Sequence, residues 1–305
     1  MMAVPPILVI LGPTASGKSE LAFALAQRCG AHILSVDSMQ VYRGMDIGTA
    51  KPSAQERIQV RHHAIDLVEP NETFTVARFV EVADAVIADA RGQGVPLIAT
   101  GGTPLYFKAL FEGMFEGPSA DAALRDRLRA LTNEELHQKL QTVDPAAAGR
   151  IHLNDTKRLV RALEVYELTG QPITSLQREW GSDHLRHEAI WIGLDWEREQ
   201  LNRRINARVK AMMAAGWVEE TRELLKEYAE LSKTAAEATG YQEILQHLHG
   251  KMSLEEATEQ IKIATRQLAR RQMKWFRRFL NVSWLDGAKP LEEKLEHAMK
   301  YWSLT

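Results

Sequence analysis

Cysteine is almost absent from this sequence. Cys29 is the only cysteine among the 305 residues, which excludes an intramolecular disulfide and any zinc site built from several cysteines, and which favours a reducing compartment. No apolar run approaches the roughly 20 residues that a membrane-spanning helix needs. Residues 1–6 also lack the charged and apolar regions of a signal peptide. We therefore expect a cytoplasmic protein that does not bind a membrane.

The chain also lacks an excess of charge of either sign. There are 38 Lys+Arg and 40 Asp+Glu residues, so any binding to nucleic acid must depend on local clusters of cations. Hydrophobic residues make up 45% of the chain and charged residues 26%, which is typical of a soluble globular protein. A chain of this length can bury one large core or two smaller ones.

A glycine-rich segment, GPTASGKS at residues 12–19, lies between an apolar run at 7–11 and a helical pattern at 20–26. This pattern and its strand–loop–helix setting predict a phosphate-binding loop, in which backbone N–H groups and a helix N-terminus bind an anion. Lys18 would reach the terminal phosphate, and the Ser19 hydroxyl could ligate Mg²⁺. The predicted diphosphate-binding residues are Gly12, Pro13, Thr14, Ala15, Ser16, Gly17, Lys18 and Ser19, together with Arg204 and Arg208 from one face of a later helix.

Two further strand ends are expected beside this loop. A buried strand at 32–36 leads to Asp37, and a strand at 95–100 leads through two glycines to Thr103. Ligands of open parallel sheets lie beyond the carboxyl ends of the strands. Asp37 could hold Mg²⁺ through water, act as a general base or only cap a turn. Thr103 could bind a ligand in the same crevice or only cap the next helix.

Strand and helix patterns alternate from the start of the chain to residue 117. With a further strand candidate at 62–67 and a strand that returns at 189–194, they predict a parallel three-layer sheet. Residues 118–189 carry helical patterns and caps instead. The predicted fold is therefore α/β, a P-loop NTPase-like parallel sheet flanked by helices, with an inserted all-helical domain. The core would comprise residues 1–117 and 190–305, and the insert residues 118–189.

The last long helical pattern, at about residues 254–280, is strongly basic. Between residues 262 and 278 it contains lysines and arginines but no acid, and Trp275, Phe276 and Phe279 are interleaved with them. Such a mixture suits phosphate contacts combined with base stacking. The alternative is a helix whose aromatic residues form core and whose cations face solvent.

Six motifs occur along the chain, in the order GPTASGKS, DSMQVYRGMDIGTAKP, GGTPLY, NDTKRLVRALEVYELTG, ATGYQEI and TRQLARRQMKWFR. This set resembles the bacterial tRNA dimethylallyltransferases. The resemblance implies transfer of a dimethylallyl group from dimethylallyl diphosphate to N6 of the adenosine immediately 3′ of the anticodon, in tRNAs that read codons beginning with U. It also implies that the phosphate loop holds the prenyl diphosphate and not ATP. We expect Mg²⁺ as the cofactor and a monomeric chain.

The resemblance also implies roles for individual residues. Asp37 would be the base that removes the N6 proton, Thr103 would support catalysis, and the adenine would flip out of the anticodon loop. The expected tRNA contacts include cations of the basic helix. They are Asp37, Ser38, Met39, Gln40, Thr103, Arg125, Arg161, Ala162, Leu163, Glu164, Val165, Gly240, Tyr241, Gln242, Arg270, Lys274, Trp275, Phe276, Arg277, Arg278, Phe279, Leu280, Asn281 and Val282.

Three other functions stay open on the residues alone. A small-molecule kinase could use the same loop and Asp37, but it would leave the basic helix unexplained. A prenyltransferase that acts on free adenine nucleotides would need neither the insert nor the basic helix. A non-catalytic RNA-binding protein would have no need to keep Lys18, Ser19, Asp37 and Thr103 together.

Overall fold

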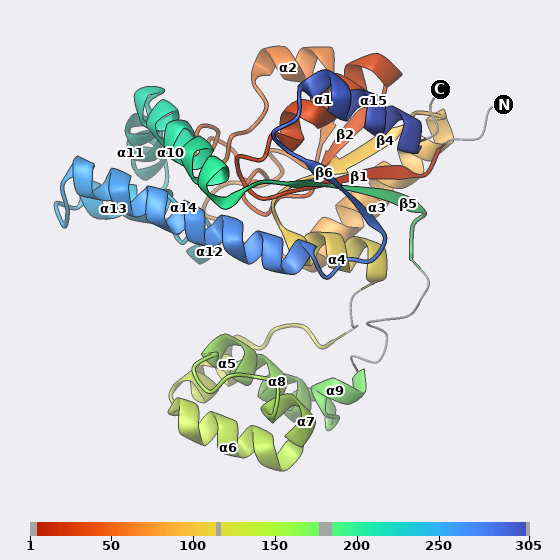
Figure 1. Ribbon diagram of the computed structural model, residues 1–305. Coiled ribbons are helices and arrows are strands. Elements are labelled where there is room, and N and C mark those ends of the chain that lie inside the picture. The colour runs from red at the N-terminus through yellow and green to blue at the C-terminus, as the bar shows by residue number, and fades with distance from the viewer. Residues whose placement is uncertain (1–4, 114–116, 177–184, 303–305) are drawn as a thin grey trace. The chain divides into compact units, whose positions relative to one another are not determined.

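The computed structural model describes residues 5–113, 117–176 and 185–302. The chain divides into two compact units, which we call unit 1 (Met1–Phe111 with His187–Thr305) and unit 2 (Glu112–Arg186). Figure 1 shows unit 1 as a sheet covered by helices and unit 2 as a group of helices. The boundaries of unit 2 differ by a few residues from those of the predicted insert, residues 118–189.

Six parallel strands form the sheet of unit 1, in the order β3-β2-β4-β1-β5-β6. They are β1 (Ile7–Leu11), β2 (His32–Ser35), β3 (His62–His63), β4 (Leu97–Thr100), β5 (Ala189–Asp195) and β6 (Val282–Asp286). The central strands β1 and β4 are buried along their whole length, as expected for a parallel sheet with helices on both faces. The predicted α/β fold with an inserted helical domain is confirmed.

The helices of the first unit surround this sheet. They are α1 (Lys18–Cys29), α2 (Ala54–Gln59), α3 (Val76–Gln93), α4 (Pro104–Glu112), α10 (Arg198–Ala214), α11 (Trp217–Glu227), α12 (Lys233–Ala236), α13 (Tyr241–Leu248), α14 (Leu254–Phe276) and α15 (Leu291–Trp302). None of the helices in the described ranges is long and apolar enough to cross a membrane.

The side chains of β1 alternate between two apolar cores. Ile7, Val9 and Leu11 pack in a large core with residues of α3, α4, α10 and α14. Leu8 and Ile10 point to the opposite face and pack with α1 and α15. This alternation follows from the pleat of a strand. Because helices cover both faces, the loops that follow the carboxyl ends of the strands are the part of the sheet that can bind a ligand.

Unit 2 is built from α5 (Ala122–Arg129), α6 (Asn133–Val143), α7 (Pro145–Ala148), α8 (Thr156–Thr169) and α9 (Ile173–Leu176). Leucines of α5, α6 and α8 form its core, among them Leu128, Leu136 and Leu159. A capping box begins α6: the Thr132 hydroxyl accepts a hydrogen bond from the N–H of Glu135, and the Glu135 carboxylate accepts one from the N–H of Thr132.

Two strands differ from the sequence-based prediction. The strand expected at 62–67 ends after His63, because Ala64 (φ 60°) and Asp66 (φ 53°) adopt left-handed backbone conformations that interrupt an extended chain. The edge strand β6 was not predicted, because the basic helical pattern was extended to about residue 280, whereas α14 ends at Phe276. Val282 pairs with Trp191 of β5.

A close approach of two loops requires glycine at position 101. A Cβ atom there would lie 2.0 Å from the carbonyl oxygen of Val36. We expect Gly101→Ala to lower the free energy of unfolding by about 2 kcal/mol, because the backbone must move to relieve the clash. The measurement is urea denaturation followed by tryptophan fluorescence.

Gly92 in α3 is the matched control, because a Cβ there would meet nothing within 4 Å. Gly92→Ala is expected to raise the free energy of unfolding by about 0.5–1 kcal/mol through the helix propensity of alanine. Equal effects of the two substitutions would contradict the close approach at Gly101.

Candidate active site

The phosphate loop connects β1 to α1. Ala15 (φ 64°) and Gly17 (φ 89°) are left-handed, and Gly17 is the N-cap of α1. The N–H of Ser16 donates to the carbonyl of Pro13 at 3.2 Å, which closes the turn. Alternating handedness of this kind directs successive backbone N–H groups toward one side, where they can bind an anion at the start of a helix.

Lys18 is buried at the base of this loop, with 9% of its surface exposed. Burial and, to a smaller extent, the charge of Arg208 lower the pKa of its ammonium to about 8, and the charge of Asp37 opposes the shift. The ammonium donates to the carbonyl of Pro13 at 3.3 Å. The hydroxyl of Ser16 is also buried and has no hydrogen-bond partner among the described residues. An anion in the loop would therefore favour the charged form of Lys18.

A cavity of about 350 Å³ lies on the loop. Its lining residues are Ala15, Ser16, Gly17, Lys18, Ser19, Glu20, Arg204, Ala207 and Arg208. Both arginines of α10 that were predicted to bind diphosphate therefore reach the phosphate loop. Ser19, the predicted magnesium ligand, also lines the cavity.

Arg204 is held in place by the loop and by an aromatic ring. Its Nε donates to the carbonyl of Ala15 at 2.9 Å, and its guanidinium lies 4.5 Å from the ring centroid of Trp196. The Trp196 indole in turn donates to the carbonyl of Ser16 at 2.9 Å. These two donors fix the carbonyls of Ala15 and Ser16.

Asp37 and Thr103 meet at the ends of β2 and β4. Oδ1 of Asp37 accepts from the N–H of Met39 at 2.9 Å. The Thr103 hydroxyl accepts from the N–H of Ser38 at 2.9 Å and donates to the Ser38 hydroxyl at 3.1 Å. Desolvation lowers the pKa of Arg208, and Asp37 opposes that shift as it does for Lys18. The structure thus brings the predicted base into the electric field of the phosphate-binding cations.

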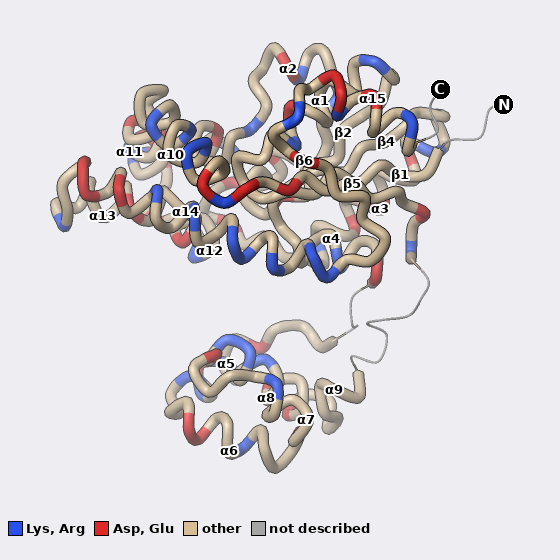
Figure 2. Tube along the Cα trace, in the orientation of Figure 1, with Lys and Arg blue, Asp and Glu red and all other residues tan. Residues whose placement is uncertain are grey.

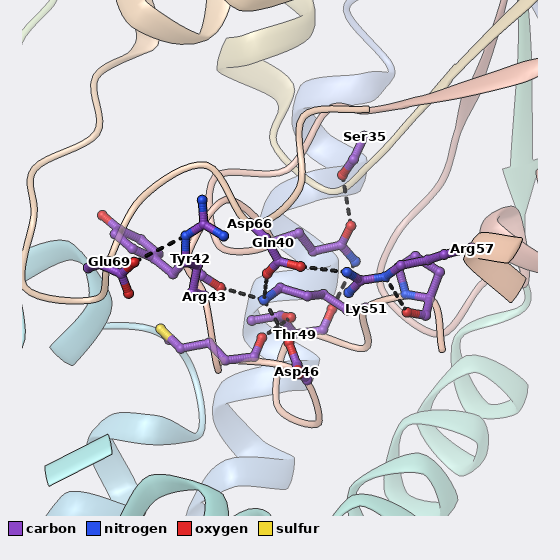
Figure 3. Close-up of polar contacts among 12 residues, drawn as sticks. Ser35, Gln40, Tyr42, Arg43, Asp46, Thr49, Lys51, Arg57, Asp66 and Glu69 are labelled. Atoms are coloured by element: carbon purple, nitrogen blue, oxygen red, sulfur yellow. Dashed lines mark hydrogen bonds and ion pairs between the residues drawn. The ribbon is translucent and has the colours of Figure 1, made fainter. Parts of the chain in front are cut away.

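Gln40 has a different environment from the one expected of an RNA-binding side chain (Figure 3). Its Oε1 accepts from the Ser35 hydroxyl at 2.7 Å, and its Nε2 donates to the carbonyls of Thr49 and Ala50 at 3.1 and 3.2 Å. Both amide hydrogens are therefore used within the chain. Gln40 stabilises the loop at residues 45–52, and its amide nitrogen has no hydrogen left for a base.

A buried ion cluster supports the same loop and was not predicted. The Lys51 ammonium, with its side chain only 1% exposed, contacts Asp46 at 2.7 Å and Asp66 at 2.6 Å, and Arg57 also contacts Asp66 (Figure 3). Burial alone would raise the pKa of Asp66, but the hydrogen bonds from Lys51 and Arg57 outweigh it and lower the pKa. The four residues lie within the segment 46–66 but follow no periodic pattern.

The basic helix is confirmed as α14, and Lys and Arg recur along it (Figure 2). Arg270, Lys274, Arg277 and Arg278 are exposed, and Arg277 also forms an ion pair with Asp195 at 3.2 Å. Half-buried Trp275 lies under the guanidinium of Arg278, at 5.5 Å. The cations and Trp275 can therefore meet a polyanion.

Other side chains at the end of α14 belong to the core. Phe276 is fully buried, which corrects the prediction that its side chain contacts tRNA. Half-buried Phe279 stacks on Trp191 with ring centroids 5.1 Å apart. Leu280 is 79% exposed, and Asn281 is left-handed (φ 57°), so the chain turns here toward β6.

Most of the residues expected to contact tRNA in α8 are also buried. The side chains of Ala162, Leu163, Glu164 and Val165 lie inside unit 2, so they form its core rather than a surface for RNA. The Glu164 carboxylate binds two half-buried arginines, Arg125 at 2.8 Å and Arg161 at 2.7 Å. Both arginines are among the residues expected to contact tRNA, and in the structure they neutralise this buried carboxylate.

The segment at residues 240–242 also contains both a buried and an exposed side chain. Tyr241 is buried and donates to Glu220 at 2.6 Å, whereas Gln242 is exposed. Gly240 is left-handed (φ 97°), and a Cβ there would lie 1.9 Å from the Trp217 ring. Tyr241 is thus a core residue, and of this segment only Gln242 has an exposed side chain.

Fold and site together define a P-loop protein of the α/β class, in which the charge of a strand-end carboxylate acts on cations that line the cavity. The sequence profile of IPP transferases matches residues 40–279, and that of isopentenyl transferases matches residues 5–66. This chain belongs to the IPP transferase family and is a prenyl transferase. The resemblance to bacterial tRNA dimethylallyltransferases is confirmed.

Individual relatives match along nearly the whole chain. The tRNA dimethylallyltransferase of Geobacter metallireducens is 44% identical over 300 residues, which is 97% of both chains. That of Symbiobacterium thermophilum is 47% identical over 290 residues, or 93% of this chain and 90% of the relative.

Solved structures share the fold. The tRNA isopentenylpyrophosphate transferase of Bacillus halodurans has a TM-score of 0.73 at 37% identity, covering 98% of this chain and 96% of its own. A eukaryotic dimethylallyltransferase solved while acting on tRNA has a TM-score of 0.81 at 30% identity, covering 92% of this chain and 73% of its own.

The lowered pKa of Lys18 makes a prediction about anion binding. Because the ammonium loses its proton above about pH 8, the affinity for inorganic pyrophosphate should fall at least about ten-fold between about pH 7.5 and 9.5 relative to Lys18→Arg. Arginine stays charged throughout this range and serves as the control. Isothermal titration calorimetry measures both affinities. An identical pH dependence of the two proteins would show that the Lys18 ammonium does not bind the anion.

Proposed function

We propose that this protein transfers a dimethylallyl group from dimethylallyl diphosphate to N6 of the adenosine immediately 3′ of the anticodon, in tRNAs that read codons beginning with U, and releases diphosphate. Family membership and relatives named tRNA dimethylallyltransferases support this proposal. The observation that carries it is the position of Asp37, a strand-end carboxylate whose charge acts on Lys18 and Arg208 at the phosphate loop. This arrangement suits a donor diphosphate and an acceptor that loses a proton.

The phosphate loop would bind the diphosphate of the donor. As the allylic C–O bond breaks, negative charge grows on the departing diphosphate, and preorganised donors stabilise it most. The donors proposed for this task are the loop N–H groups, Lys18, Arg204 and Arg208, which all line the cavity.

Ser19 would hold a magnesium ion on the same cavity. Mg²⁺ in phosphate sites usually takes one or two protein oxygens together with phosphate oxygens and water. The exposed hydroxyl of Ser19 on the cavity wall fits that donor set. When bound, the ion would neutralise charge on the leaving diphosphate.

Asp37 would act on the acceptor. The N6 lone pair of adenine is delocalised into the ring, so the nitrogen becomes a useful nucleophile only if a base removes its proton. The new N–C bond forms as the C–O bond breaks, the proton moves to the Asp37 carboxylate, and diphosphate leaves. Oδ1 of Asp37 is held by the N–H of Met39, and the turn bonded to Thr103 fixes the backbone beside it.

The exposed cations of α14 favour an RNA over a free nucleotide as the acceptor. Arg270, Arg271, Lys274 and Arg278 can contact successive phosphates of a polyanion, which a mononucleotide does not possess. The adenine must leave the stack of the anticodon loop to reach the cleft, and its neighbours then become available to the protein. A kinase would make no use of these cations.

Asp37→Asn removes the proposed base but keeps the shape of the side chain. We expect the rate constant of single-turnover prenyl transfer to fall at least about 10²-fold, with RNA affinity within a few-fold of wild type. Asp89→Asn, an exposed change on α3, is the control and should leave the rate unaltered. Wild-type turnover in Asp37→Asn would exclude Asp37 as the base.

Arg270→Ala tests the proposed RNA surface. We expect RNA binding to weaken and the slope of log affinity against log salt to decrease by about one, because one phosphate contact is lost. Fluorescence anisotropy with an anticodon stem-loop over a salt series measures both quantities. Arg91→Ala on α3 is the control. An unchanged slope in Arg270→Ala would mean that this face of α14 only meets solvent.

A further inference from the structure

Gln272 lies on the inner side of α14 and contacts two loops of the candidate active site. It is 5% exposed, whereas its neighbours Arg270 and Arg271 face solvent. Its Oε1 accepts from the N–H of Thr14 in the phosphate loop at 2.9 Å. Its Nε2 donates to the carbonyl of Gly102, in the turn before Thr103, at 2.7 Å. One side chain therefore joins the phosphate loop, the Thr103 turn and the basic helix.

The Gln272 amide is also next to the proposed base. The position that a Cβ of Gly102 would occupy lies 2.9 Å from Nε2 of Gln272 and 3.0 Å from Oδ2 of Asp37. Glycine at 102 is what allows the amide and the carboxylate to approach the same point. Oδ1 of Asp37 accepts from the N–H of Met39, and Oδ2 is the oxygen that lies near this point. Nothing in the motif pattern distinguished Gln272 from the surrounding cations.

We propose that Gln272 is a positioning residue that fixes the phosphate loop relative to the turns that carry Asp37 and Thr103. This inference rests on the proposed prenyl transfer. The base and the donor carbon are held by different loops, and a displacement of about 1 Å between reacting groups can cost about 10²-fold in rate. Gln272 bonds to both loops and belongs to α14, the helix that carries the proposed RNA surface.

The two hydrogen bonds require both ends of an amide. Gln272→Met has a side chain of similar length but can neither accept from Thr14 nor donate to Gly102. Gln272→Glu can still accept from Thr14, but it loses the donor and adds a negative charge near Asp37 and the diphosphate. The two variants therefore separate loss of the link from a change of charge.

The experiment compares wild type, Gln272→Met, Gln272→Glu and the control Gln260→Met, an exposed change on the same helix. For Gln272→Met we expect kcat to fall at least about ten-fold and pyrophosphate affinity to fall several-fold, with the KM for RNA within about three-fold of wild type. For Gln272→Glu we expect pyrophosphate affinity to fall further than in Gln272→Met, because the added negative charge repels the anion.

Other results would overturn the inference. Wild-type kcat and pyrophosphate affinity in Gln272→Met would do so, as would a pyrophosphate affinity in Gln272→Glu no lower than that of Gln272→Met. If kcat, RNA affinity and Tm of Gln272→Met all fell together, Gln272 would be a structural contact and not a positioning residue. If wild type itself fails to prenylate RNA, the proposed function fails separately, and pyrophosphate affinity alone then decides whether Gln272 supports the phosphate loop.

Discussion

The burial of the Lys18 ammonium is the constraint on which the rest of the site depends. Its burial is costly, as the lowering of its pKa to about 8 reflects, and it is tolerated because the loop carbonyl of Pro13 and the charge of Asp37 lie close by. A diphosphate would supply the countercharge that the protein alone supplies only in part. Arg204 and Arg208 of α10 line the same cavity, although the charge of Arg208 repels the Lys18 ammonium.

Helix α14 has two faces with different tasks. Its outer face carries the cations Arg270, Arg271 and Lys274, while its inner face contributes Phe276 to the core and Gln272 to the loops of the cleft. A helix that is rigid over 23 residues can hold both faces in a fixed relation. The proposed RNA surface on α14 and the phosphate loop therefore belong to the same packed unit, unit 1, and Gln272 joins them directly.

The sequence predicted those parts of the fold that depend on local pattern. The phosphate loop, the strands that lead to Asp37 and Thr103, and the basic character of α14 are all readable from spacing and composition. The limits lie in contacts between distant residues. Gln272 bonds to Thr14 across 258 positions, and Lys51 contacts Asp66 through a loop without periodicity, so neither could be predicted from a pattern. Trp275 and Phe276 are adjacent, and only packing determines which of them is exposed.

The most direct test of the account is to incubate the protein with Mg²⁺, dimethylallyl diphosphate and an anticodon stem-loop RNA that carries the adenosine, and to measure the mass of the RNA. The account predicts a gain of one C5H8 unit on this RNA, with none on an RNA that has guanosine at that position and none on AMP. An unmodified RNA together with prenylated AMP, or with consumption of ATP, would contradict it.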